Sequence, residues 1–564
     1  MITHRITQGS LLAAALLLGT ACNDTTSPSL SAVTSVTIAP AADSLVVGKT
    51  IQLTATTQDA TGHTLTGRVV VWTSSDTTKA KVTAAGLVTG VAVGSATITA
   101  TSERKSGTAA LTLILVAVPA QVTVSPSSIT TVIGGSVLFQ AYLDSAGFAL
   151  DGPVTWTSSN PAVAIARDTL DFGVTQGFVT GVSTGAATIT ATSLHGKGTA
   201  TVVVARVAFV AVSAGGVHSC GLTTNGAVFC WGNDNFGALG AAITTDFTQC
   251  LILDLVNLPC SASPVGVTGG LAFATVHASA YGQDDEDAGG GTCGLTAGGA
   301  AYCWGLNAND DVHPARVLGP PFTAISVGFL HTCGLSTTGA AYCWGLWNSG
   351  GQLGSGDTVS RTSPTLVTGG LTFKAISAGN FHTCGLVLDG AAYCWGSNSW
   401  YYNGGGWLGT GDTLNRAVPT PVIGALTFAA ISAGGYHTCA LTTNGVAYCW
   451  GSNSFGQLGT GDTITHTVPT PVAGGLTFAA ISAGNRHTCG LTTNGVAYCW
   501  GQWNPAPLPV AGGLTFTGIS AGGVHTCGLT SNGTAYCWGG GLEGQLGNGA
   551  YADRSSPHKV LGQP

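Results

Sequence analysis

The stretch ISAGNRHTCGLTTNGVAYCWG, residues 481–501, decides how this chain folds, because variants of it recur throughout the region after residue 206. Each copy contains two cysteines ten residues apart, with a tryptophan directly after the second. The cysteine pairs are Cys220 and Cys230, Cys293 and Cys303, Cys333 and Cys343, Cys384 and Cys394, Cys439 and Cys449, Cys489 and Cys499, and Cys527 and Cys537. Such a repeat is typical of a β-propeller, in which each blade is one small sheet that cannot bury its faces alone.

The spacing of the two cysteines follows from the geometry of a β-hairpin. Residues 493–495 are predicted to form the turn, because Gly495 can adopt the left-handed conformation that a three-residue loop with a bulge requires. Pairing then runs outward, with residue 492 opposite 496 and Cys489 opposite Cys499. This last pair is not hydrogen-bonded, so its Cα atoms lie about 4.5 Å apart, within reach of a disulfide. Each repeat is therefore predicted to contain a disulfide across its hairpin.

Two copies of a different unit precede the propeller. Residues 34–117 and 118–206 each contain a strand ending in Trp-Thr-Ser-Ser, at Trp72 and Trp156, and each contains Ala-Thr-Ile-Thr-Ala-Thr-Ser near its end. Alternating β-branched residues separated by frequent turns are typical of β-sandwiches. We expect both tryptophans to fill sandwich cores. The short junction at Pro119 predicts a semi-rigid stalk rather than a flexible tether.

Residues 1–21 are predicted to be an export signal, followed by a linker at residues 22–33. A weakly basic start precedes an apolar run at residues 11–18, which is shorter than the roughly 20 residues of a membrane span. The segment Leu-Gly-Thr-Ala-Cys ending at Cys22 resembles the lipidation site of bacterial lipoproteins, in which the cysteine becomes the lipidated N-terminus. The alternative is plain secretion, with Cys22 lost or free.

The cysteine count agrees with export. Of the 17 cysteines, 14 belong to the repeats and Cys22 is the candidate for lipidation. Cys250 and Cys260 lie in one long insertion and are predicted to bond each other, so that none is left over. This parity is typical of an oxidising compartment. We expect a lipoprotein of the bacterial outer membrane, cell surface or periplasm, or a secreted protein, that meets the membrane only through its lipid anchor.

The composition argues against several classes of function. Charged residues make up 7% of the chain, against about 25% in a typical soluble domain, and the net charge is −7. The 17 lysines and arginines are spread thinly, so no basic patch is predicted that would bind nucleic acid. The sequence contains no His-Glu-x-x-His motif and no phosphate-binding loop. We therefore predict no catalytic residues, no metal and no cofactor.

Residues 207–564 resemble the regulator-of-chromosome-condensation repeat, because Ala-Gly-x-x-His recurs in register with Trp-Gly and Gly-Gln-Leu-Gly-x-Gly. The two preceding units resemble the bacterial immunoglobulin-like domain, group 2, a spacer or adhesive module. These resemblances imply an all-β chain, with two immunoglobulin-like β-sandwiches followed by a seven-bladed β-propeller. The strand-like segments at its start and end, near Val207 and Val560, predict one composite blade that closes the ring. The eukaryotic prototype is a guanine-nucleotide exchange factor, an activity that the export signal argues against here.

Specific function is expected where one blade departs from its siblings. Blade four carries five extra residues compared with Ser-Asn-Ser-Phe-Gly-Gln-Leu in blade five. They place aromatic residues on a loop, and exposed aromatic side chains commonly anchor protein or sugar partners. The candidate binding residues are Trp400, Tyr401, Tyr402 and Trp407, with Trp347 and Trp503 at comparable places in blades three and six. The alternative is that these rings pack on neighbouring blades.

Three other polar patterns are given structural interpretations. Residues 284–287, Asp-Asp-Glu-Asp, lack the spacing of a calcium loop and are predicted to be a solvated acidic loop. The repeated Gly-Asp-Thr is predicted to form turns. The histidine found in six of the repeats is expected to make hydrogen bonds near the central shaft, since zinc ligands converge on one ion. These acids and histidines are Asp357, Asp412 and Asp462, and His218, His331, His382, His437, His487 and His525.

Taken together, these features predict an exported, lipid-anchored, monomeric surface protein that is not an enzyme. Its propeller head is expected to bind an unknown protein or glycan at the cell envelope. One alternative is a secreted enzyme that cleaves carbohydrate or peptide at the propeller channel, although repeated carboxylates are lacking there. Another is a structural module without a specific ligand.

Overall fold

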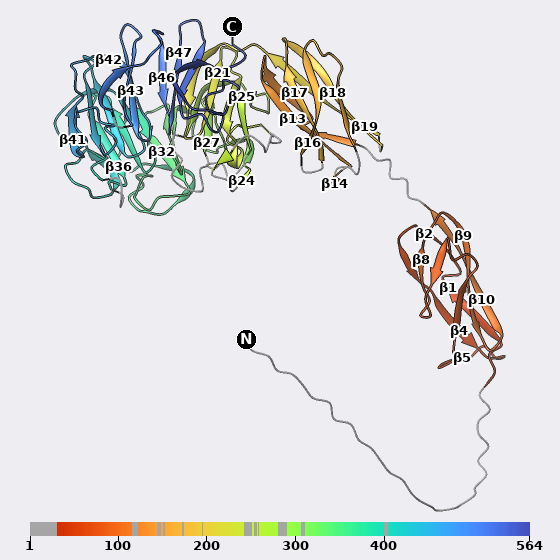
Figure 1. Ribbon diagram of the computed structural model, residues 1–564. Coiled ribbons are helices and arrows are strands. Elements are labelled where there is room, and N and C mark those ends of the chain that lie inside the picture. The colour runs from red at the N-terminus through yellow and green to blue at the C-terminus, as the bar shows by residue number, and fades with distance from the viewer. Residues whose placement is uncertain are drawn as a thin grey trace, which may run out of the picture. The chain divides into compact units, whose positions relative to one another are not determined.

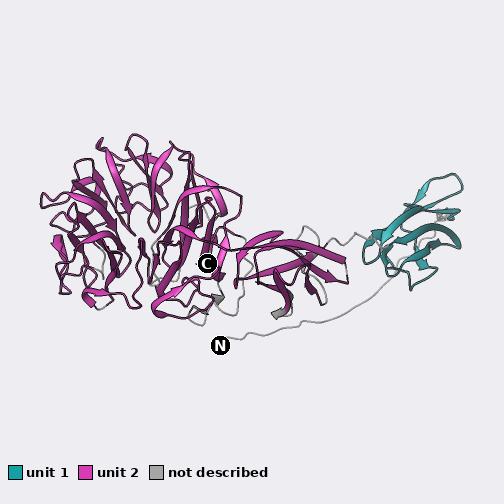
Figure 2. Ribbon diagram, turned by 90° about the horizontal axis from the view of Figure 1, so that it is seen from above, with its two compact units in different colours: residues 1–119 teal, residues 120–564 magenta. Residues whose placement is uncertain are grey.

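The computed structural model describes residues 31–563, apart from residues 115–121, 144–147, 150–152, 172–173, 195, 242–250, 253–255, 258, 280–289, 306–310, 400–403 and 503. The described residues form β-strands and one short 3-10 helix, η1 (Asn235–Gly237). The chain divides into two compact units, residues 1–119 and 120–564 (Figure 2). Within the described part of the chain, no helix is both long enough and apolar enough to cross a membrane. The predicted export signal and Cys22 lie outside the described residues.

The first unit contains one sandwich built from three small sheets, with strand orders β1-β4-β5, β2-β10-β9-β6 and β3-β8-β7. Its core includes Ile98 and Leu111, with Trp72 packed against it. Its strands are β1 (Ser35–Ala39), β2 (Ala42–Val46), β3 (Thr50–Gln52), β4 (Thr54–Gln58), β5 (Thr64–Leu65), β6 (Val71–Ser74), β7 (Ala80–Val82), β8 (Leu87–Gly90), β9 (Gly94–Ser102) and β10 (Lys105–Ile114).

The second sandwich repeats this arrangement. The order β15-β18-β19-β12 matches β6-β9-β10-β2, and β12 runs parallel to β19 as β2 does to β10. The opposite sheet has the order β11-β13-β17-β16, and Trp156 is buried between them. Its strands are β11 (Val122–Ser125), β12 (Ser128–Val132), β13 (Ser136–Leu143), β14 (Phe148–Ala149), β15 (Thr155–Ser158), β16 (Ala164–Asp171), β17 (Val174–Gly181), β18 (Gly185–Ser193) and β19 (Gly196–Ala205).

The remainder of the chain forms seven blades, each built from four antiparallel strands that follow one another in chain order (Figure 1). In chain order, the first strands are β20 (Phe209–Ala214), β26 (Phe273–Ala278), β30 (Phe322–Val327), β34 (Phe373–Ala378), β38 (Phe428–Ala433), β42 (Phe478–Ala483) and β46 (Gly518–Ala521). The second strands are β21 (His218–Thr223), β27 (Gly291–Thr296), β31 (His331–Ser336), β35 (His382–Val387), β39 (His437–Thr442), β43 (His487–Thr492) and β47 (His525–Leu529).

The third strands carry the second cysteine of each repeat: β22 (Val228–Asn233), β28 (Ala301–Gly305), β32 (Ala341–Gly345), β36 (Ala392–Gly396), β40 (Ala447–Gly451), β44 (Ala497–Gly501) and β48 (Ala535–Gly539). The fourth, outer strands are β25 (Cys260–Gly266), β29 (Asp311–Arg316), β33 (Arg361–Leu366), β37 (Arg416–Pro421), β41 (His466–Pro471), β45 (Asn504–Pro509) and β49 (Arg554–Lys559). A small ribbon, β23 (Leu251–Ile252) with β24 (Val256–Asn257), lies in the insertion of blade one. Each outer strand contains a proline, which discourages edge-to-edge pairing.

The first strands form the inner wall of the ring. β20 contacts β26 on one side and β46 on the other, so blades one and seven meet. The prediction of a composite blade is wrong, because β20 pairs with β21 and β49 pairs with β48. The chain enters the ring at the first strand of blade one and leaves after the fourth strand of blade seven. Every blade is therefore complete without sharing strands.

The ring closes with the same contacts that join covalently connected blades. At the junction of blades three and four, the Phe373 amide donates to the Gly339 oxygen in the preceding hairpin turn, at 2.8 Å. At the closing junction, the Phe209 amide donates to the Gly533 oxygen, at 2.9 Å. The closing junction thus repeats the hydrogen bonding of the others.

The second sandwich and the propeller share one core. Trp156, Ile189 and Val202 of the sandwich belong to the same buried cluster as Cys220 and Val265 of blade one. The sheet containing β12 continues through β25 into blade one.

Candidate functional site: the loop face of the propeller

The connections on one end of the ring carry most of the variation between blades. Because the strands of a blade are antiparallel, the loop joining its first and second strands and the loop joining its third and fourth strands lie at the same end. We call this end the loop face. In blade five it comprises residues 434–436 and 452–465. The tight turns between the second and third strands lie at the opposite end.

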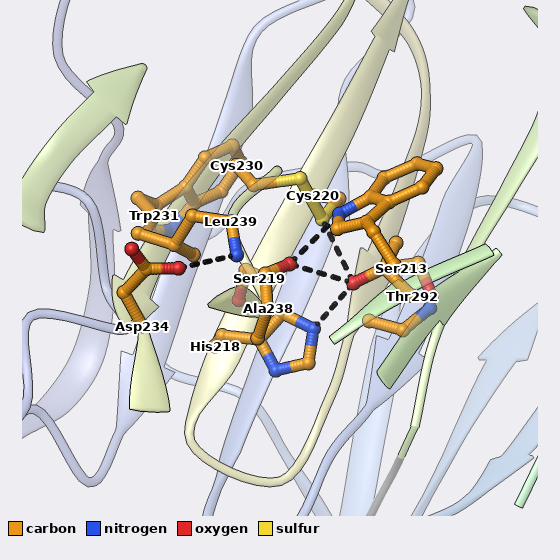
Figure 3. The surroundings of a disulfide bond; sticks show 12 residues. Ser213, His218, Ser219, Cys220, Cys230, Trp231, Asp234, Ala238, Leu239 and Thr292 are labelled. Carbon is orange, nitrogen blue, oxygen red and sulfur yellow. Dashed lines mark hydrogen bonds between the residues drawn. A yellow bond between two sulfur atoms is a disulfide. The ribbon is translucent and has the colours of Figure 1, made fainter. Parts of the chain in front are cut away.

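All seven predicted hairpin disulfides are present, with a Cα–Cα distance of 4.1 Å in each. Cys489 lies opposite Cys499, and Gly495 has a φ of 81°, which confirms the predicted register and turn. Figure 3 shows the disulfide of blade one. Cys260 is also disulfide-bonded, while its predicted partner Cys250 lies outside the described residues. The disulfides fix each hairpin that supports the loop face.

The histidines of the repeat join neighbouring blades. In six blades, histidine Nε2 lies 2.7–2.9 Å from a hydroxyl of the following blade, as Figure 3 shows for His218 and Thr292. Burial lowers the pKa of these histidines to about 3 or about 4, so they are neutral at pH 7. The pairs are His218–Thr292, His331–Thr383, His382–Thr438, His437–Thr488, His487–Thr526 and His525–Ser219. The predicted structural hydrogen bonds are confirmed.

The same hydroxyl also holds the loop of the preceding blade. Thr488 of blade six donates to the main-chain oxygen of Gln457 in blade five, at 2.8 Å. Since a hydroxyl has one hydrogen, it accepts from His437, whose imidazole must carry its proton on Nε2. The neighbouring Gly459 lies so close to Trp500 that a Cβ would be 2.7 Å from the indole. The Gly-Gln-Leu-Gly segment therefore packs between two neighbouring blades, and we call it the wedge.

Blade two departs from this network. Gly291 stands where the other blades have the histidine, and His277 stands where they have a first-strand serine. Residues 306–310, which lie outside the described residues, do not contain Gly-Gln-Leu-Gly. As a result, the Oγ1 of Thr332 in blade three is buried without a hydrogen-bond partner among the described residues. Among the described residues, the junction of blades two and three therefore has neither the histidine bond nor the bond to a main-chain loop oxygen that its siblings make through this hydroxyl.

The predicted aromatic loop is only partly described. Trp400, Tyr401 and Tyr402 lie outside the described residues, between Ser399 and Gly405, which pair in an isolated bridge. Their predicted role in binding stays a prediction.

The prediction that Trp407 is exposed is wrong, because its side chain is fully buried. Its ring packs 6.4 Å from Phe381 and 5.4 Å from Tyr436, between centroids. Its main-chain oxygen accepts a hydrogen bond from Thr438, as that of Gln457 does from Thr488. Trp407 therefore occupies the glutamine position of the wedge, an alignment that Trp407-Leu-Gly could have revealed.

Among the described residues, five large apolar side chains are exposed on the loop face of blades three to five. Leu346 and Trp347 are 46% and 41% exposed. Val359, Leu414 and Ile464 occupy one equivalent position in the three blades and are 60%, 64% and 65% exposed. Sequence reasoning noted Trp347 and missed the three aliphatic residues. The sequence pattern that would have identified them is an apolar residue two positions after the aspartate of each repeated Gly-Asp.

The aspartates of this motif order the turns that present these residues. Asp357 accepts a hydrogen bond from the Val359 amide at 3.1 Å and pairs with Arg361 at 2.7 Å. The Arg361 side chain, with the Val359 amide, holds the pKa of Asp357 well below its usual range. Equivalent pairs join Asp412 to Arg416 and Asp462 to His466. The predicted turn role of the aspartates is confirmed.

Asp234 of blade one is a buried acid in the same kind of loop. Its Oδ1 accepts from the Leu239 amide at 2.8 Å (Figure 3), just as Asn453 accepts from Leu458 in blade five. Burial raises the pKa of Asp234 to about 8, so its carboxyl group is protonated at neutral pH and, like the asparagine amide, carries no charge. Within the described ranges, no three His, Cys, Asp or Glu side chains converge as metal ligands would.

Seven four-stranded blades, linked by buried histidines and preceded by two immunoglobulin-like sandwiches, define a β-propeller protein that presents loops on a rigid ring. Residues 184–563 match the RCC1-like domain, and the chain belongs to this family. Residues 32–113 and 119–204 match the bacterial Ig-like domain (group 2). Propellers of this family serve as scaffolds for protein interaction.

Individual proteins agree with this assignment. The RCC1 domain-containing protein RUG3, mitochondrial, from Arabidopsis thaliana is 31% identical over 252 residues, 43% of this chain and 53% of that protein. The chain thus spans about half the length of this relative. Human WBSCR16 has a TM-score of 0.50 at 19% identity, covering 59% of this chain and 94% of that one. Prp20p from Saccharomyces cerevisiae has a TM-score of 0.50 at 20% identity, covering 60% and 87%.

Proposed function

We propose that this protein is an exported, lipid-anchored surface protein whose propeller binds a partner protein through its loop face. The observation that carries the proposal is the group of exposed apolar side chains on blades three to five, from Leu346 to Ile464. Apolar patches on a soluble surface mark interaction sites, and three of these side chains occupy one equivalent position on consecutive blades. Trp347 is the proposed anchor, because aromatic residues that become buried on binding contribute most of the affinity at protein interfaces.

The neighbouring loop is included in the proposal. Trp400, Tyr401 and Tyr402 belong to blade four, between the blades that carry Val359 and Ile464. We propose that they extend the same contact area. The structure of Prp20p was described together with its binding to Gsp1p and histones, so a ring of this family can serve protein recognition. A glycan partner at the cell envelope is the second candidate, favoured by the aromatic content of this loop.

The test is capture by the full-length chain from envelope extracts, followed by mass spectrometry. Trp347→Ala combined with Leu414→Asp should abolish the capture of a specific protein. The matched control is Leu366→Asp, since Leu366 is 54% exposed but lies on the outer strand β33. The proposal is wrong if the double variant captures the same proteins as the unmodified chain. A glycan array probed with the same variants distinguishes the two partner classes.

Export and anchoring are tested separately. Seven buried disulfides support folding in an oxidising compartment. Replacing Cys22 by serine should move the protein from the membrane fraction to the soluble fraction and abolish incorporation of labelled fatty acid. An unchanged distribution would refute the lipid anchor without affecting the proposed binding face.

A further inference from the structure

The closing junction of the ring is set apart from the other six because no peptide chain crosses it. At the junction of blades three and four, residues 367–373 connect the blades covalently, and Val367 and Leu371 belong to their core. At the closing junction, Val560 and Val207 occupy the corresponding places. The Val207 amide donates to the Gly562 oxygen at 3.0 Å, so a hydrogen bond stands where a connecting loop would be.

A residue of the second sandwich completes this junction. Val132, the last residue of β12, is fully buried in the cluster that contains Val207, Val560 and Trp231. It packs so closely on Gly562 that a Cβ there would lie 2.1 Å from the Cβ of Val132. Gly562 also has a φ of 75°, which a glycine adopts without strain. The sandwich, the start of the propeller and its C-terminal segment therefore meet at one point.

The rest of β12 holds the sandwich against blade one. Thr131 pairs with Val265 of the outer strand β25, which makes one continuous sheet of the two domains. The Ser136 amide donates to the Ser263 hydroxyl at 3.3 Å. A Cβ at Gly266 would lie 3.0 Å from the Cβ of Thr130. The outer edge of blade one is thus covered by a neighbouring domain of the same chain.

We propose that the second immunoglobulin-like domain is the clasp of the propeller and keeps blades one and seven together. A ring closed by a composite blade is held by backbone pairing within one sheet, but here every blade is complete and that device is absent. Val132 takes over this role by packing against residues on both sides of the closing junction. Its strand β12 holds it in place, because β12 pairs with β19 of the sandwich and with β25 of blade one. The domain is then part of the head and not a spacer.

Hydrogen exchange of single amides in the full-length chain tests the clasp. The amides of Phe209 and Val207 report on the closing junction. The amide of Phe428, which donates to Gly390 at 2.8 Å between covalently linked blades, is the internal reference. Gly562→Ala should push Val132 away and speed exchange at Phe209 and Val207 by about tenfold or more, with Phe428 unchanged.

The matched control is Gly369→Ala, at the equivalent position of blade three. Gly369 has a φ of 98° but nothing within 4 Å of the site of its Cβ, so this variant carries the backbone strain without the clash. It should leave Phe209 and Val207 as in the unmodified chain. If both alanine variants speed exchange at Phe209 equally, strain alone explains the effect and the clasp is refuted.

A second pair of variants keeps the test valid if Gly562→Ala fails to fold. Val132→Ala removes the contact at the junction, whereas Val179→Ala removes an equally buried valine from the core of the same sandwich. Val132→Ala should speed exchange at Phe209 by about tenfold, while Val179→Ala should act on β13, β16 and β17. Unchanged exchange at Phe209 in Val132→Ala overturns the proposal, and so does an equal rise in both variants.

Discussion

The junction between blades two and three and the junction between blades three and four use one scaffold in different ways. Between blades three and four, His331 and the Gln352 oxygen both bond Thr383, and Ser326 accepts from the Ala378 amide. Between blades two and three, the equivalent threonine, Thr332, has no partner among the described residues. Both junctions retain the bond from the phenylalanine amide to the preceding turn, at 2.8 Å.

The difference separates what builds the ring from what can vary within it. The backbone bond recurs at both junctions, and beside each junction the phenylalanine packs on the tryptophan of its own blade, with centroid distances of 5.8 Å and 5.7 Å. The polar links to the threonine recur at one junction and, among the described residues, are missing at the other. Blade two therefore keeps the backbone bond to blade three, while its described residues provide no hydrogen bond to Thr332.

Acid should produce the largest effect, because each junction contains a neutral histidine, fully buried at His331 and half-buried at His277. Burial lowers the pKa of His331 to about 3 and that of His277 to about 4. Below pH 6.5 the unfolded chain binds protons that the folded chain does not, so stability falls until the folded pKa is reached. Each buried histidine then contributes a loss of up to about 1.4 kcal/mol per pH unit.

Urea unfolding at pH 7, 6 and 5 measures this dependence. The whole chain should lose several kcal/mol between pH 6.5 and pH 5. His277→Ser, which restores the residue of the sibling blades, and His382→Gln should each reduce the slope by about one proton. An unfolding free energy that does not depend on pH in this range would contradict the burial of these histidines.

The hairpin disulfides should contribute equally to the free energy of unfolding, whether or not the neighbouring junction has its polar links. Cys333–Cys343 lies in blade three, beside the junction with blade two where Thr332 has no described partner. Cys439–Cys449 lies in blade five, between two junctions that have the histidine bond. Both close loops of the same length, so removing either pair by serine substitution should cost about 3 kcal/mol. Thermal unfolding of the two double variants provides the measurement. A cost that differs by more than about 1 kcal/mol would show that the junction affects the blade beside it.

Local features of the fold could be predicted from the sequence, because hairpin pairing depends on neighbouring residues. The register of Cys489 and Cys499 follows from one turn, and the structure confirms it. The closure of the ring could not be predicted, since it depends on Val132, which lies more than 400 residues from Gly562 in the sequence. The burial of Trp407 was missed because aromatic content was given more weight than its position in the wedge. Its alignment with Gln457 would have predicted the buried position of Trp407.

The smallest predicted effect is the sharpest test of the comparison, since it exchanges one hydroxyl for a methyl group. Thr383 and Thr332 are equally buried, but only Thr383 has hydrogen-bond partners among the described residues. Thr383→Val leaves the His331 Nε2 proton and the Gln352 oxygen without it, at a cost of about 1–3 kcal/mol. Thr332→Val removes a buried polar atom that bonds nothing described, so its unfolding free energy should be unchanged or rise by up to about 1 kcal/mol. Urea unfolding of the two variants decides between these outcomes. An equal loss in both would mean that Thr332 has a partner and that the two junctions are alike.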